Sequence, residues 1–311
     1  EQGRIKLWNV ATAMNDNHLE VYGRPLDPTN TEDYRMILHN LTAAYDEQME
    51  RQGTPEEWYV EDITEALQVT ENILPEVADP LHRDTFLTMA ALLSPQQEVT
   101  KNWHNAVQAF AGWINDGVMP LMKPNGTNWG VSAHRTGLQL FQKLIEDNGG
   151  VAGAIGWLRD PRSAREIAEY RRDSGLFVPD RAIGKYLPEE MGINDITIGA
   201  YMMGPKVGDF MMNATGYDQT AVTVDLWIAR QYNRLIGRLL DVNNTLRSKG
   251  MPQNKPRNAA ERQHMKNLIT DLAEIKGVQP SAVQAVLWYY EQRLFNEHGI
   301  RAEPASFADA A

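Results

Sequence analysis

Hydrophobic residues recur every three or four positions along most of the chain, with polar residues between them. This spacing places apolar side chains on one face of a helix, whereas the strict alternation of half-buried strands is almost absent. The pattern predicts helices over 31–51, 57–74, 81–93, 96–114, 130–147, 161–172, 205–215, 221–240, 258–276 and 280–298. The expected fold class is therefore all-α.

Three segments lack this helical pattern. Residues 115–129 and 241–257 are rich in Gly, Pro and Asn, which predicts long surface loops. The end of the chain, from Glu303 to Ala311, is expected to be frayed.

Charge is distributed unevenly. The net charge is −11, but residues 1–100 hold 19 acidic and 6 basic residues, whereas residues 101–311 hold 22 acidic and 24 basic residues. The overall sign disfavours a nucleic-acid partner, yet the acidity belongs to the N-terminal third. Two later stretches are rich in basic residues: Arg159, Arg162, Arg165, Arg171, Arg172, Arg181 and Lys185, and then Arg247, Lys249, Lys255, Arg257, Arg262 and Lys266. They permit DNA binding without requiring it.

Several classes of site lack support in the sequence. The chain has no cysteine, which excludes disulfides, cysteine-ligated zinc and iron–sulfur clusters. The seven histidines show no metal-binding spacing, and no phosphate-binding glycine loop or serine-nucleophile motif occurs, so we expect neither metal nor cofactor. Without a long apolar run or a signal-peptide pattern, we expect an intracellular, cytoplasmic protein with no membrane partner.

Two residues near the middle of the chain raise the question of catalysis. Gly204-Pro205 can end one helix and begin the next, which places Lys206 in a first helical turn, and Asp225 is a natural N-cap for a helix over 226–240. A lysine beside a positive helix dipole and apolar neighbours should have a lowered amine pKa, as a nucleophile needs. Spacing alone nevertheless favours a surface lysine and a structural cap.

The surrounding motifs resemble a known family. GPKVGD at 204–209, followed by AVTVD at 221–225 and then Arg230, resembles the helix-hairpin-helix DNA glycosylase superfamily, most closely its 8-oxoguanine-type branch. In that family the lysine and the aspartate of these motifs are catalytic. The resemblance implies a two-lobed helical fold with a hairpin motif near 196–210.

A second match lies about 110 residues upstream. AALLSPQQ at 90–97 resembles the family's Leu-Ser-x-Gln segment, whose polar side chain fills the space left by an extruded base. This assigns Gln96 and Gln97 to base binding; the alternative is a simple helix-start turn with solvated amides. The motifs imply a glycosylase-like core over 81–240, within a domain over 76–311 that also holds the helices of 258–298. Residues 1–75 are expected to form an acidic helical extension.

The resemblance also implies a mechanism. A modified base is flipped from the duplex into a pocket between the lobes. Lys206 attacks the sugar C1′, expels the base and forms a Schiff base that permits strand cleavage, while Asp225 stabilises the developing oxocarbenium charge. The expected activity is DNA N-glycosylase, with or without lyase activity, and the expected partner is DNA carrying a modified base.

Five further residues have candidate roles. Gly204 and Gly208 belong to the hairpin, and Trp227 could stack on an extruded base, as could Trp288, although aromatic residues at helical spacing are more often core. Arg230, one turn after the aspartate, could pair with it, contact phosphate or form a buried bridge.

The sequence also departs from the family pattern. The hairpin usually reads Leu-Pro-Gly-x-Gly-x-Lys, but Met202 stands in place of the first glycine, Gly208 replaces the usual alanine, and Trp227 replaces a frequent histidine. These changes indicate a divergent branch with bacterial or phage-encoded relatives, among them the clade named for α-glutamyl/putrescinyl thymine pyrophosphorylases. The run at 280–291 resembles a segment of phage-type members.

Two other functions stay open at this point. The same fold could attach or exchange a group on a modified pyrimidine without cutting the glycosidic bond. The chain could also be a catalytically inactive DNA-binding or virion-associated domain, which the missing hairpin glycine and the acidic N-terminal third favour.

Overall fold

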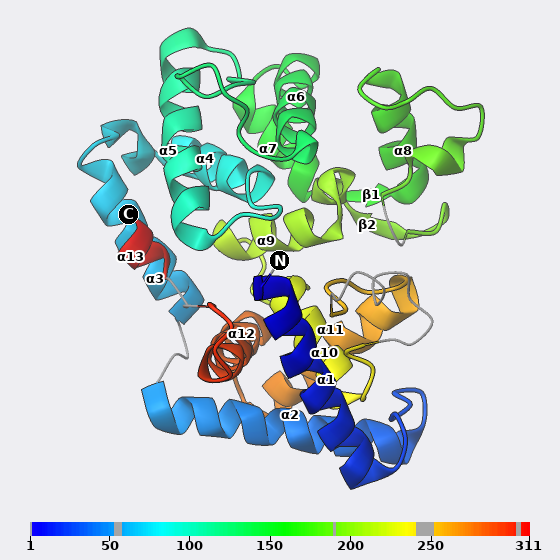
Figure 1. Ribbon diagram of the computed structural model, residues 1–311. Helices are drawn as coiled ribbons and strands as arrows, with labels where there is room; N and C mark the ends of the chain where they lie inside the picture. The colour runs from blue at the N-terminus through cyan, green and yellow to red at the C-terminus, as the bar shows by residue number, and fades with distance from the viewer. Residues whose placement is uncertain (1, 53–57, 189–190, 241–251, 303–305) are drawn as a thin grey trace. The chain divides into compact units, whose positions relative to one another are not determined.

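The chain folds into two compact helical units. The computed structural model describes residues 2–52, 58–188, 191–240, 252–302 and 306–311 (Figure 1). Unit 1 comprises Glu1–Trp58 and Val224–Pro304, and unit 2 comprises Tyr59–Thr223 and Ala305–Ala311. Helices dominate both units, which confirms the predicted all-α class.

Unit 1 is organised around one C-terminal helix, α12. Its helices are α1 (Gln2–Tyr22), α2 (Thr31–Gln52), α10 (Leu226–Leu235), α11 (Ala259–Lys276) and α12 (Pro280–Glu297). Helix α12 packs against α2, α10 and α11. Buried residues distant in the sequence meet in one core cluster: Ala11, Leu239, Leu240, Phe295 and Ala302. The two ends of the chain therefore build one hydrophobic core.

Unit 2 is organised around helix α4. Its elements are α3 (Trp58–Glu71), η1 (Pro75–Ala78), α4 (Pro80–Leu92), α5 (Val99–Asp116), α6 (Ser132–Asp147), α7 (Val151–Arg159), β1 (Pro161–Ser163), α8 (Ala164–Asp173), η2 (Ile183–Tyr186), β2 (Ile196–Ile198), η3 (Gly199–Met203), α9 (Pro205–Ala214) and α13 (Phe307–Ala310). Every residue of α4 from Thr85 to Leu92 is buried. Such a helix is surrounded on all sides, here by α5, α6, α7 and α9.

A two-stranded antiparallel sheet interrupts the helical pattern of unit 2. Strand β1 pairs with β2 in a register that places Pro161 opposite Ile198 and Ser163 opposite Ile196. The helix predicted to begin at 161 therefore begins at Ala164, where Ser163 and Glu166 form a reciprocal capping box.

Other boundaries also differ from the prediction. Helix α1 was not predicted, because the polar run 15–18 interrupts its apolar face, and α7 was missed because its glycines lower helix propensity. Helix α5 begins at Val99 rather than 96. Helix α10 spans Leu226–Leu235 rather than 221–240, because the residues before Asp225 are extended.

The two units do not coincide with the expected division at residue 75. Residues 1–58 share a unit with 224–304, and polar contacts connect the two segments: Tyr34 donates to Asp271, Arg293 to Gln48, and Lys276 to Asp46. A local sequence pattern carries no information on such long-range pairing, so the discontinuous unit could not be read from it.

The C-terminal end is packed rather than frayed, which corrects the expectation for its described part, 306–311; residues 303–305 lie outside the described chain. The Asp62 carboxylate accepts hydrogen bonds from the backbone N–H groups of Phe307 (2.6 Å) and Ala308 (3.0 Å). The buried Phe307 ring lies 5.5 Å from Trp103 and is stacked at 6.0 Å on Phe210 of α9. The last helix thus braces α5 and α9.

We expect Phe307→Ala to lower the free energy of unfolding by about 3–5 kcal/mol, because it removes a buried ring and leaves a cavity between Trp103 and Phe210. Urea denaturation followed by circular dichroism measures the change. Val178→Ala is the matched control, since Val178 is 89% exposed in the same unit and its truncation should cost less than about 0.5 kcal/mol. Equal losses in the two variants would show that the C-terminal helix contributes nothing specific.

Candidate active site

Lys206 lies in the first turn of α9, as predicted. The preceding turn depends on Gly204, whose φ of 97° and ψ of 152° lie in a region that is essentially restricted to glycine. Pro205 then occupies the first helical position, where its fixed φ suits the helix and its missing N–H has no cost. Lys206 is half-buried at this helix end, where the backbone dipole is positive.

The glycine at 208 brings η3 against α9. A Cβ atom at this position would lie 2.5 Å from the Tyr201 ring and 3.1 Å from the carbonyl carbon of Ala200. The Tyr201 hydroxyl donates a 2.6 Å hydrogen bond to the buried Asp209 carboxylate, which fastens the two elements together. The segment predicted as a hairpin near 196–210 is thus built from β2, η3 and α9, with a tight 3₁₀ turn before the lysine helix.

Gln96 occupies an exposed and strained position in the loop between α4 and α5. Its φ is +57°, and it is the one described non-glycine residue with a positive φ. For a side chain with a Cβ this conformation costs roughly 1–2 kcal/mol, so surrounding contacts must hold it. The structure therefore separates the two predicted glutamines: Gln96 projects from the loop, whereas Gln97 is half-buried.

Gln97 packs against the loop that precedes α6. A Cβ atom at Gly130 would lie 2.7 Å from Gln97 Nε2 and 2.8 Å from the His134 ring, so glycine allows this close approach. The backbone N–H of Gln97 donates a hydrogen bond to the backbone carbonyl of Ser94 at 3.2 Å. These contacts assign Gln97 a role in holding the loop, which favours Gln96 as the residue that reaches a ligand.

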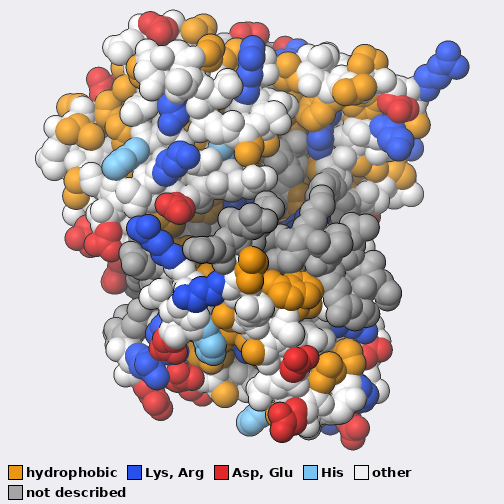
Figure 2. Space-filling view, in the orientation of Figure 1, with side chains coloured by type: hydrophobic (Ala, Val, Ile, Leu, Met, Phe, Trp, Pro, Cys, Tyr) orange, Lys and Arg blue, Asp and Glu red, His pale blue; other side chains and the backbone are white. Residues whose placement is uncertain are grey.

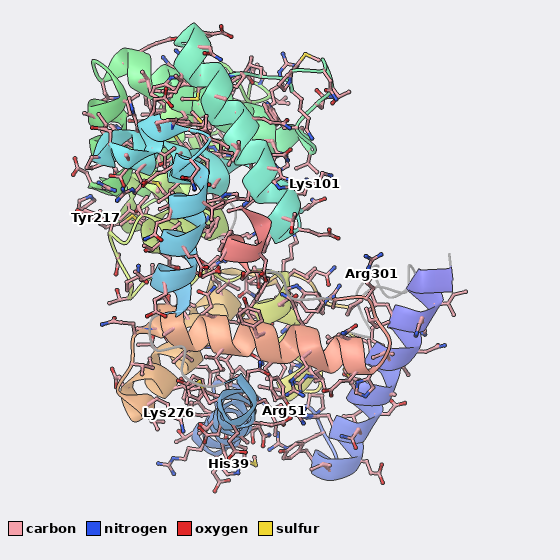
Figure 3. All side chains as sticks on the ribbon, turned by 90° about the vertical axis from the view of Figure 1, so that its left-hand side faces the viewer. His39, Arg51, Lys101, Tyr217, Lys276 and Arg301 are labelled. Atoms are coloured by element: carbon pink, nitrogen blue, oxygen red, sulfur yellow. The ribbon has the colours of Figure 1, made fainter. Side chains whose placement is uncertain are left out.

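His134 links the Gln96 loop to Lys206. Its fully buried imidazole Nε2 lies 2.8 Å from the Pro95 carbonyl oxygen. Burial lowers the pKa of His134, and the positive charges of Lys101 and Lys206 lower it further, against the opposing effect of backbone hydrogen bonds. Lys101 extends from α5 (Figure 3). Two lysines far apart in sequence therefore lie near the histidine that contacts the Gln96 loop.

Asp225 forms the N-cap of α10, which confirms that prediction. Its Oδ1 accepts hydrogen bonds from the backbone N–H groups of Trp227 (2.9 Å) and Ile228 (3.0 Å). Its Oδ2 accepts a 2.9 Å hydrogen bond from Trp288 Nε1. Three donors thus fix the orientation of the carboxylate. Sequence reasoning placed Trp288 in the core, and nothing in the sequence linked it to Asp225.

Asn213 is a second residue that sequence reasoning missed. Its buried amide donates to the carbonyl oxygens of Asp218 and Ala221, at 2.9 Å each, and accepts from the Thr223 hydroxyl at 2.9 Å. These bonds tie the non-helical segment 218–223 to α9, which explains why the predicted helix does not begin at 221. They also fix the segment that leads to Asp225.

Arg230 and Trp227 pack inside unit 1. The Arg230 guanidinium lies 4.8 Å from the Trp227 ring centroid and 5.4 Å from that of Phe295, and its Nε donates to Asn254 at 3.0 Å. Burial lowers the pKa of Arg230 to about 10. Of the three predicted roles, the geometry supports a buried structural contact, with Asn254 as the polar partner instead of Asp225.

The first basic stretch is largely occupied by contacts within unit 2. Arg159 pairs with Asp84 at 2.8 Å, Arg162 covers the Trp157 ring, and Arg171 covers the Phe177 ring. On the visible face of each unit, basic side chains are interspersed with acidic ones (Figure 2). In the second stretch, Arg247 and Lys249 lie outside the described residues.

Unit 1 contains a cavity of about 490 Å³. Its lining comes from α1, α2, α10 and α12 and includes His18, Tyr22, Arg234 and Tyr290, but none of the predicted site residues. In the described ranges, no three His, Asp or Glu side chains are grouped so that they could hold a metal ion. A helix with the length and apolar character needed to cross a membrane is likewise absent from these ranges.

The structure brings the predicted residues together in two groups. In unit 2, the charge of Lys206 acts on His134, whose imidazole contacts the loop that carries Gln96. In unit 1, four residues are joined by the contacts described above: Asp225, Trp227, Arg230 and Trp288. The boundary between the units falls after Thr223, so the pairing of Lys206 with Asp225 stays a prediction.

We expect Gln96→Gly to leave the free energy of unfolding unchanged or to raise it by up to about 1 kcal/mol, because glycine adopts the left-handed backbone without strain. Gln97→Gly, the matched control one residue later, should lower it by about 1 kcal/mol, because it removes a packed side chain at a negative φ. Chemical denaturation of both variants checks this. A Gln96→Gly variant less stable than Gln97→Gly would contradict the assignment of strain.

Comparison with protein-family models, with curated proteins and with solved structures found no match. The function of the protein is therefore inferred from its residues and their geometry. The resemblance to the glycosylase superfamily stays a prediction.

Proposed function

We propose that the protein is a DNA glycosylase that excises a modified base, with Lys206 as the nucleophile and Asp225 as its electrostatic partner. One observation carries the proposal. Gln96 and Lys206 belong to the two motifs that resemble the family, about 110 residues apart in sequence, and His134 relates them within unit 2. His134 contacts the loop of one motif, and its imidazole feels the charge of the lysine of the other.

The surroundings of Lys206 suit nucleophilic attack. The side chain lies in the first turn of α9, at the positive end of the helix dipole, and it is half-buried. In the proposed step the amine nitrogen forms a bond to C1′ of the sugar and loses a proton. The glycosidic C–N bond breaks, and the base leaves with the electron pair and takes up a proton. The sugar ring then opens: the C1′–O4′ bond breaks, O4′ takes up the remaining proton of the amine, and the nitrogen lone pair forms the C=N bond. This Schiff base is the intermediate of a bifunctional glycosylase.

The geometry of Asp225 suits an electrostatic role. The carboxylate oxygens accept three hydrogen bonds in total, and a carboxylate has about four acceptor positions. One position remains for a developing positive charge on the sugar, and the carboxylate does not need to reorient during the reaction. Trp288 is therefore a positioning residue for Asp225.

We expect sodium borohydride to trap a covalent complex between the protein and duplex DNA that carries its modified base, because reduction fixes the Schiff base on Lys206. Lys206→Gln should abolish the complex. Lys143→Gln is the matched control, since this lysine of the same unit pairs with Asp147 at 2.9 Å and its loss should leave trapping within about twofold of wild type. Denaturing electrophoresis of labelled DNA measures the yield.

The same reaction separates the other functions. The experiment uses duplexes that carry different base modifications, because the shape of the pocket and contacts from residues distant in the sequence decide which base the protein recognises. An intact sugar–base bond with a changed base mass would replace the proposal with base-modifying transfer. DNA binding without trapping, base release or change of mass on any duplex would indicate an inactive DNA-binding domain.

We expect Trp288→Phe to slow single-turnover base release by roughly tenfold, because it removes the indole N–H that holds Oδ2 of Asp225 and keeps most of the ring. DNA affinity should change by less than about twofold. Trp113→Phe is the control, a tryptophan of unit 2 that packs edge-on to His82. Base release at the wild-type rate in Trp288→Phe would remove Trp288 from the mechanism.

A further inference from the structure

The loop between α4 and α5 adopts a conformation that its own residues do not favour. Gln96 has the left-handed backbone at its exposed tip, where it has no helix or strand to hold it. Within the loop, the Ser94 hydroxyl donates to the Ala91 carbonyl at 2.8 Å, and the Gln97 N–H donates to the Ser94 carbonyl at 3.2 Å. The first bond closes on the end of α4, and the second closes a β-turn around Pro95 and Gln96 that has its positive φ at Gln96. The carbonyl of the peptide between Pro95 and Gln96 takes part in neither bond, so its orientation depends on a contact from another element.

His134 supplies a contact from a different element, helix α6. Its imidazole is 0% exposed, and Nε2 lies 2.8 Å from the Pro95 carbonyl oxygen, the last backbone acceptor before Gln96. Because a carbonyl only accepts, Nε2 carries the proton and donates it. A hydrogen bond in a site that excludes water is stronger than the same bond at the surface.

Gly130 closes the loop from the other side. Its φ is +153°, and a Cβ atom there would be 2.7 Å from Gln97 and 2.8 Å from His134. Gln97 and the His134 ring therefore both pack close to the Gly130 backbone, in the segment before α6. The strained tip is over-determined by its surroundings, which is the condition under which such a conformation persists.

We propose that His134 is the positioning residue of the Gln96 loop: its bond to the Pro95 carbonyl holds Gln96 where its side chain enters the space of an extruded base. The inference depends on the proposed function, because it gives Gln96 a base to replace. Without the bond, the Pro95–Gln96 backbone relaxes toward negative φ, and the Gln96 side chain points elsewhere. DNA would still bind, but the extruded base would have no replacement in the duplex.

The position of His134 among charged groups fits this role. Lys101 on α5 and Lys206 on α9 act on the ring, and both are of the sign that attracts a DNA phosphate. The lysines draw the backbone of a duplex toward the same place where the loop presents Gln96. A neutral imidazole holds the loop here without adding a third positive charge.

The test uses the full chain with His134→Ala, His134→Gln and His104→Ala. The amide of glutamine can donate to the Pro95 carbonyl and serves as the rescue, and His104, exposed on α5, is the matched control. Two quantities are measured: hydrogen exchange of the peptide over 93–98 without DNA, and the fluorescence of 2-aminopurine paired opposite the modified base. DNA binding is followed by anisotropy.

We expect His134→Ala to raise exchange in 93–98 at least tenfold and to lose most of the 2-aminopurine signal, while DNA affinity changes by less than twofold. His134→Gln should restore both signals in part, and His104→Ala should match wild type. A protected loop and a full fluorescence signal in His134→Ala would overturn the proposal.

Two further outcomes of the experiment also test the proposal. If His134→Ala does not fold, ¹⁵N-histidine spectra of the wild type still test the bond, and a rapidly exchanging Nε2–H would overturn it. If no duplex gives a fluorescence signal with the wild type, the proposed function fails, and with it the role of Gln96 in base extrusion. The exchange data then report on the loop alone.

Discussion

The close packing of η3 on α9 is the constraint on which the candidate site depends. It needs glycine at two positions for different reasons: Gly204 for a backbone conformation that other residues do not adopt, and Gly208 for the absence of a Cβ atom beside Tyr201. Together they set the direction of α9 and hence the place of Lys206. The family pattern that this segment resembles has a further glycine where Met202 stands, and here that side chain is buried. A methionine at that position therefore packs into the unit, and the turn is made by Gly204.

The chain on each side of the unit boundary is held by polar contacts within its own unit. Before the boundary, Asn213 ties the non-helical segment up to Thr223 to α9. After it, the Asp225 carboxylate caps α10 and accepts the Trp288 N–H. Only Val224, which is buried, separates the two anchors. The separation of Lys206 and Asp225 along the sequence thus corresponds to one helix, one tethered loop and one cap.

Local sequence signals were sufficient to predict most helices, including the helix starts at which Lys206 and Asp225 lie. Pro205 and Asp225 mark helix starts through short-range backbone chemistry, which a sequence shows directly. The hydrogen-bond partners of the candidate site lie far away in the sequence: His134 contacts the Gln96 loop, and Trp288 donates to Asp225. Arg230 shows the converse: contact with a phosphate was one of three roles that the sequence left open, and in the fold its guanidinium packs against two aromatic rings. Only long-range packing distinguishes these cases.

Long-range packing also changes the electrostatic argument against DNA. Along the sequence the first hundred residues hold the excess of acid, but the fold pairs several of these residues with later basic ones, as in Glu47 with Arg293 and Asp84 with Arg159. Counted by unit, unit 1 holds 19 acidic and 17 basic residues, whereas unit 2 holds 22 acidic and 13 basic residues. Residues 1–58 therefore belong to the nearly neutral unit and do not form a separate acidic extension. The excess of acid lies in unit 2, the unit that holds Lys206. The proposed function therefore requires Lys101 and Lys206 to attract phosphate locally, against the net charge of their own unit. Affinity for DNA should then depend on these few contacts more than on the overall field.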